Sequence, residues 1–118
     1  MNRILSILSA LLLTTTLSAA EQLLSPDNRL SMSFSTDTDG RMIYCLTMQG
    51  DTLIRPSHLG LSLENDQLLT GFEILNTERS TFDETWTPVW GEESAIRNHY
   101  NELCVFVRQM PQNRYMYM

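Results

Sequence analysis

Residues 30–48 read L-S-M-S-F-S-T-D-T-D-G-R-M-I-Y-C-L-T-M, and they indicate an all-β fold. From Leu30 to Phe34 every second residue is apolar and the residues between are serines, the period of a strand with one buried face. Residues 37–40 (D-T-D-G) predict a turn, because glycine accepts a positive φ. Residues 41–48 predict a second strand, apolar on both faces and therefore central in its sheet.

The chain on either side of this hairpin repeats the pattern in short segments separated by Gly, Asp, Asn and Pro. Further strands are predicted at residues 52–55, 59–63, 71–77, 103–110 and 114–118. Pro56 is expected to end the ladder of the first of these, because proline has no N–H to donate. No window after residue 20 has a helical period, so the sequence predicts an antiparallel β-sandwich.

Residues 1–20 have the pattern of an export signal. Asn2-Arg3 gives a positive start, residues 4–13 are an apolar run, and Ser18-Ala19-Ala20 offers a cleavage site before Glu21. The apolar run is shorter than the roughly 20 residues of a transmembrane helix, and no cysteine follows the site to carry a lipid anchor. A periplasmic or secreted domain of residues 21–118 is expected; the alternative for residues 1–20 is a buried N-terminal helix.

The charge of the chain excludes two classes of partner. The 118 residues contain 14 Asp and Glu against 8 basic residues, all arginine, for a net charge of −6. Nucleic acids and anionic membranes require clustered positive charge, so neither is expected to bind. Cys45 and Cys104 lie within apolar strand-like runs, where a disulfide or two free thiols are both consistent with the sequence. Their spacing matches no metal motif.

The stretch 82–103 reads F-D-E-T-W-T-P-V-W-G-E-E-S-A-I-R-N-H-Y-N-E-L and does not have the composition of a simple core segment. It contains both tryptophans beside Pro88 and Gly91, followed by a dense polar cluster at residues 97–102. With upstream motifs S-P-D at 25–27, P-S-H-L-G-L at 56–61 and G-F-E at 71–73, it resembles the N-terminal domain of glycoside hydrolase family 97. These are secreted bacterial enzymes acting on α-glucosides or α-galactosides.

The resemblance implies more than the residues show on their own. It implies the N-terminal portion of a β-sandwich similar to galactose mutarotase, and enzymes several times longer than this chain. Their catalytic acid and base lie in a (β/α)8 barrel that follows this domain, and their calcium is held largely by later residues. An α-linked oligosaccharide and the missing barrel are the implied partners of the full-length enzyme. We therefore expect a truncated chain that is inactive alone.

The acidic pairs do not change that expectation. Glycoside hydrolysis needs two carboxyl groups about 5–5.5 Å apart for retention or roughly 6.5–9.5 Å apart for inversion. The neighbours Asp83-Glu84 and Glu92-Glu93 point to opposite faces of an extended backbone, so neither pair converges on one bond. No residue is assigned a catalytic role and none a metal-binding role.

The polar and aromatic residues of this stretch are instead candidates for substrate contact or for a domain interface. The two tryptophans have three interpretations: a platform for a sugar ring, an anchor at the interface with the barrel, or core packing. If residues 97–102 are extended, Arg97, His99 and Asn101 share one face, and an arginine paired with a carboxylate would fix a loop or a domain contact. The candidates are Trp86, Trp90, Glu92, Arg97, His99, Tyr100 and Glu102.

Two functions follow from these observations. The first is the carbohydrate-binding and supporting domain of a secreted α-glycosidase that lacks its catalytic barrel. The second is a free-standing sugar-binding β-sandwich module. The final segment, residues 114–118, begins a strand without a turn or polar tail after it, which favours the first.

Overall fold

The computed structural model describes residues 20–118, which form nine β-strands and no helix. The predicted export signal lies outside this range except for Ala20. No helix within these residues is long and apolar enough to cross a membrane. The strands are β1 (Glu21–Leu24), β2 (Leu30–Thr36), β3 (Met42–Met48), β4 (Asp51–Leu59), β5 (Leu61–Leu63), β6 (Asp66–Leu68), β7 (Phe72–Trp86), β8 (Ile96–Gln109) and β9 (Arg114–Tyr117).

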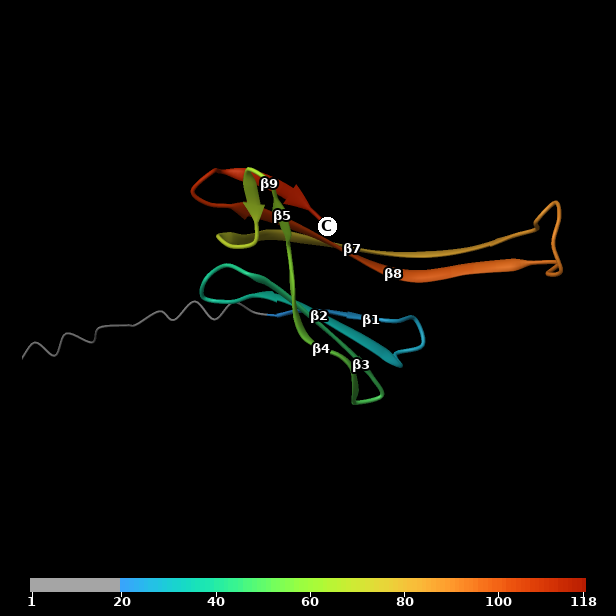
Figure 1. Ribbon diagram of the computed structural model, residues 1–118. Helices are drawn as coiled ribbons and strands as arrows, with labels where there is room; N and C mark the ends of the chain where they lie inside the picture. The colour runs from blue at the N-terminus through green and yellow to red at the C-terminus, as the bar shows by residue number, and fades with distance from the viewer. Residues whose placement is uncertain (1–19) are drawn as a thin grey trace, which may run out of the picture.

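The strands form two larger sheets and a small hairpin, and every pairing is antiparallel. One sheet has the order β1-β2-β3-β4, the other has the order β7-β8-β9, and β5 pairs with β6 between them in the chain. Figure 1 shows the two sheets as separate layers, with the β7–β8 ribbon continuing far beyond them. The predicted antiparallel all-β fold is confirmed.

The core lies between the two larger sheets. Phe34 and Met42 come from the first sheet, while Phe72, Val105 and Val107 come from the second, and all five are buried. This is the face that the alternation in residues 30–36 and 103–107 predicts. The layers are also joined through backbone, because the N–H of Phe72 donates to the carbonyl of Gly40 at 2.9 Å. Gly40 has φ 69°, as the predicted turn requires.

Pro56 does not end the pairing of its strand, so that prediction is wrong. β4 runs from Asp51 to Leu59 and contains the proline. The register moves from Ile54 opposite Leu46 to Ser57 opposite Tyr44, so two residues of β4 face one of β3. Proline is accepted there because a bulge on an edge strand leaves an N–H without a ladder partner anyway.

The two cysteines are free thiols on strands of different sheets. Cys45 on β3 follows Tyr44, which packs on the core, and Cys104 on β8 precedes buried Val105. Alternate residues of a strand point to opposite faces, so the two sulfurs lie on the outer sides of different sheets. Of the two alternatives that the sequence allows, a disulfide or two free thiols, the structure has the free thiols.

Candidate functional site: the β7–β8 arm

The main departure from a plain sandwich is a long hairpin that projects from it. β7 and β8 pair in one register from Thr77 opposite Val105 to Trp86 opposite Ile96, and a loop of residues 87–95 joins them. Residues 82–100, here called the arm, extend beyond the layers in Figure 1. Residues directly opposite in an antiparallel pair share a face, so the register assigns every arm side chain to one of two faces.

One face of the arm is aromatic. The rings of Phe82 and Tyr100 stack with centroids 5.4 Å apart, and Trp86 lies opposite Ile96 nearer the tip. These four side chains are between 37% and 48% exposed. In the loop Trp90 is 90% exposed, so it contacts almost nothing in the described chain. This excludes core packing for Trp90.

The other face of the arm is charged. The guanidinium of Arg97 donates to both carboxylate oxygens of Asp83, at 2.8 Å from Nε and 2.7 Å from Nη2. This fork of hydrogen bonds lowers the pKa of Asp83 and raises that of Arg97. His99 lies opposite Asp83 in the register. The expected pairing of an arginine with a carboxylate is present, and it joins the two strands of the arm.

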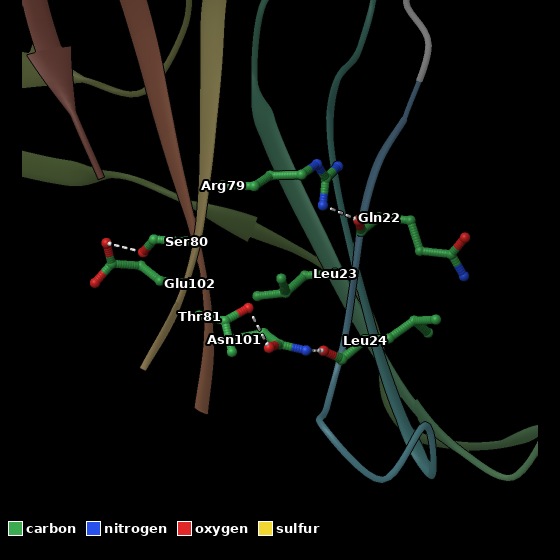
Figure 2. Close-up of a pocket in the computed structure, with 8 residues that line it drawn as sticks. All are labelled: Gln22, Leu23, Leu24, Arg79, Ser80, Thr81, Asn101 and Glu102. Carbon is green, nitrogen blue, oxygen red and sulfur yellow. Dashed lines mark hydrogen bonds between the residues drawn. The ribbon is translucent and has the colours of Figure 1, made fainter. Parts of the chain in front are cut away.

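An open groove of about 360 Å³ lies where the arm leaves the sandwich, between β1 and the β7–β8 ribbon. In Figure 2 Arg79 reaches across to the backbone of Gln22, and Asn101 lies between Thr81 and Leu24. The Nδ2 of Asn101 donates to the carbonyl of Leu24 at 2.7 Å, and its Oδ1 accepts from the Thr81 hydroxyl at 2.9 Å. These side chains hold the edge strand β1 against the ribbon.

The structure brings some of the predicted site residues together and separates others. Arg97 and His99 share the charged face, while Tyr100 lies on the aromatic face. Glu102 accepts a hydrogen bond from Ser80 at 3.2 Å and lines the groove. Glu92 is exposed in the loop, remote in sequence from every groove residue. The seven residues are therefore spread along one hairpin rather than gathered in one pocket.

Sequence reasoning missed the partners on β7. From the sequence, Asp83 is recognisable only as half of an acidic pair, and Arg79, Thr81 and Phe82 belong to no motif that predicts a role. The signal that would have found them is the symmetry of the hairpin around Gly91. Pairing residues equally distant from that glycine places Asp83 opposite His99 and Phe82 opposite Tyr100.

The geometry of the arm fits structural ion pairing better than acid–base chemistry. A general acid in glycoside hydrolysis needs a raised pKa, whereas Arg97 holds the pKa of Asp83 below its ordinary value. Glu84, next to it, points to the opposite face of the strand. Residues 20–118 contain no group of three or more His, Cys, Asp or Glu side chains close enough to hold a metal ion.

Fold and site together define an antiparallel β-sandwich fold with a projecting, partly aromatic hairpin. The model of the glycosyl hydrolase 97 N-terminal domain matches residues 23–116, and the chain belongs to that family. A retaining alpha-galactosidase of Bacteroides thetaiotaomicron is 29% identical over 108 residues, which are 89% of this chain and 16% of that enzyme.

Solved structures agree on the fold. Family 97 enzymes from Pseudoalteromonas sp. strain K8, solved in complex with panose and with acarbose, superimpose with a TM-score of 0.75 at 21% identity. A beta-arabinopyranosidase superimposes with a TM-score of 0.72 at 15% identity. In each case the match covers 82% of this chain and 15% of the other. The chain thus spans about a sixth of the relatives it matches.

Proposed function

We propose that this chain is the non-catalytic N-terminal domain of an exported α-glycosidase, where it supports the catalytic portion and contributes to carbohydrate binding. The observation that carries the proposal is the family match over residues 23–116, which corresponds to one end domain of far longer glycosidases. The low pKa of Asp83 and the opposed faces of Asp83 and Glu84 support a role outside the chemistry.

The carbohydrate contact is proposed at the groove and the adjacent aromatic face. Arg79, Asn101 and Glu102 offer donors and acceptors of the kind that bind sugar hydroxyls. Tyr100 shares a face of β8 with Glu102, is 39% exposed, and presents a ring on which a sugar face can stack. The Pseudoalteromonas enzyme has been solved with panose, so panose is a suitable probe of the α-linked class.

Export and calcium are further parts of the proposal. Residues 1–20 have the pattern of a cleaved signal, and β1 begins at Glu21, directly after the proposed cleavage site. Residues 20–118 contain no cluster of three or more His, Cys, Asp or Glu side chains. We assign any calcium of the full-length enzyme largely to its later residues.

The test is a replacement in the Bacteroides alpha-galactosidase. The region that this chain matches is exchanged for residues 21–118, and hydrolysis of an aryl α-galactoside is compared with that of the same enzyme lacking the region. The proposal predicts that the chimaera recovers activity which the deletion loses. A chimaera as inactive as the deletion contradicts the supporting role.

A free-standing sugar-binding module is the second candidate, and the high exposure of Trp86 and Trp90 favours it. Panose titrated into the purified chain, followed by NMR shifts of backbone amides, separates the two candidates. A free-standing module predicts saturable binding by the chain alone that Trp90→Ala abolishes. A supporting domain predicts at most weak shifts around Asn101 and Tyr100.

A further inference from the structure

The outer edge of β9 carries backbone groups that pair with no other strand in the part of the chain that the structure describes. Met118 and Val105 donate backbone hydrogen bonds to each other, so the N–H and C=O of Met118 face β8. Bonding alternates along an antiparallel pair, and the N–H and C=O groups of Tyr115 and Tyr117 therefore point away from β8. Because β9 is the last strand of its sheet, these groups line a free edge.

The other edges of the two larger sheets are protected against pairing with another chain. Side chains of the β7–β8 ribbon bind the carbonyls of β1, β4 contains Pro56 and a bulge, and β7 carries four carboxylates along its length. β9 has neither proline nor lysine, and its one charge, that of Arg114, is neutralised by Asp66. Of these four edges, only β9 lacks the features that keep natural edge strands from pairing.

The sequence of β9 is self-complementary. Tyr115-Met116-Tyr117 reads the same in both directions, so an antiparallel copy places Tyr115 opposite Tyr117 of the second copy, with Met116 on the two-fold axis. That register sets outward-facing backbone groups opposite each other twice and forms four hydrogen bonds. Met116 packs on the core, so both rings lie on the outer face, where they are 64% and 76% exposed and form cross-strand aromatic pairs in the dimer.

We propose that two copies of this chain associate through β9 and join their sheets, three strands from each copy, into one continuous sheet. A second copy is favoured over another peptide because it supplies two tyrosines at the matching spacing. Met116 on the axis also lines an apolar groove of about 300 Å³ with Met118 and the exposed Leu61. Pairing brings the two grooves side by side, which removes apolar surface from water. The inference does not depend on the proposed function.

The oligomeric state of the purified chain tests the proposal. Sedimentation velocity over roughly a hundredfold range of concentration should show a monomer of 13.6 kDa that converts to a dimer and to nothing larger, because pairing consumes the unprotected edge. Tyr117→Pro keeps the bonds to β8, since the N–H of Tyr117 faces away from it, but removes two of the four donors in the dimer. We expect its dissociation constant to rise about tenfold or more. A chain that is monomeric throughout, or a dimer equally stable in Tyr117→Pro, overturns the proposal.

Oxidative cross-linking tests the register. On the axis, Met116 and its counterpart form a non-hydrogen-bonded pair with Cα atoms about 4.5 Å apart, which is within the range of a disulfide. In a chain carrying Cys45→Ala and Cys104→Ala, Met116→Cys should therefore give a covalent dimer. Tyr115→Cys is the matched control and should remain monomeric under denaturing conditions, because it faces Tyr117 of the second copy. Equal cross-linking of the two variants, or none in a chain that sediments as a dimer, contradicts pairing through β9 in this register.

Discussion

At the scale of single residues, Asp83 has the sequence context of a catalytic carboxylate but forms an ion pair with Arg97. Asp83-Glu84 looks like a pair of carboxylates when only neighbours in sequence are considered. Fourteen residues further on, Arg97 donates two hydrogen bonds to Asp83 and keeps its carboxyl group ionised. Both side chains are exposed, so the pair orients the arm and contributes little to the overall stability.

This pair should give a pH-dependent contribution of predictable sign. The folded pKa of Asp83 is lowered, so the pair stabilises the protein above the ordinary pKa of 3.8 and loses that effect as the pH falls through the folded value. Asp83→Asn should therefore lower the melting temperature slightly at pH 7, and the difference should shrink as the pH falls through the folded pKa of Asp83. High salt should weaken the difference. Thermal melts of both proteins from pH 2 to 7 check this, and a difference that grows as the pH falls would contradict it.

At the scale of elements, the sequence predicts strands well where one face is buried and poorly where none is. Residues 30–36 and 103–109 alternate because the side chains of one face fill the core. β7 was expected to end at residue 77 but runs to Trp86, because the arm has no core to impose alternation on residues 78–86. There the ladder is fixed by pairing with β8 across the hairpin.

For the candidate site, the sequence predicts which residues of one strand share a face better than it predicts their partners on other strands. Arg97, His99 and Asn101 were expected to share a face if extended, and the register confirms it. Their partners Asp83, Thr81 and the carbonyl of Leu24 depend on pairing across the hairpin and across the layers. The symmetry of the hairpin around Gly91 indicates the first two partners, whereas the sequence gives no indication of the third, because Leu24 lies 77 residues from Asn101 in the chain.

The hydrogen bonds of Asn101 at the base of the arm give a prediction at the scale of elements. Asn101→Ala removes the hydrogen bonds to the Leu24 carbonyl and the Thr81 hydroxyl, which should cost about 1 kcal/mol of stability. The loss should be local, so amide hydrogen exchange in β1 should accelerate more than in β3. Asn98→Ala, further out on β8, is the control and should leave β1 exchange unchanged. Uniform acceleration in all strands would show that Asn101 does not hold β1 specifically.

At the scale of the whole molecule, the described domain has a small core and much exposed apolar surface. Only Phe34, Met42, Phe72, Val105 and Val107 are buried apolar residues in residues 20–118. An apolar groove of about 300 Å³, lined by Met42, Leu59 and Met116 among others, opens between the layers. The free edge of β9 lies beside it, and an unpaired edge strand is a template for association.

A core of this size should be sensitive to the loss of one large side chain. Met42 is only 2% exposed, and Met42→Ala should cost about 2–5 kcal/mol, comparable with the whole stability of a small domain. Urea denaturation should show the variant largely unfolded in buffer, while Leu53→Ala, at an exposed position of β4, retains the midpoint of the unaltered chain. A folded Met42→Ala protein with an unchanged midpoint would show that the core lies elsewhere.

The central claim is that this chain folds as the N-terminal domain of a family 97 glycosidase without the groups that cleave the substrate. The most direct measurement is hydrolysis of aryl α-galactosides and α-glucosides by the purified chain, with and without calcium, beside the chimaera. The account predicts no turnover above background for the chain and measurable turnover for the chimaera. Turnover by the chain alone that disappears in Glu84→Gln or Glu92→Gln would contradict it.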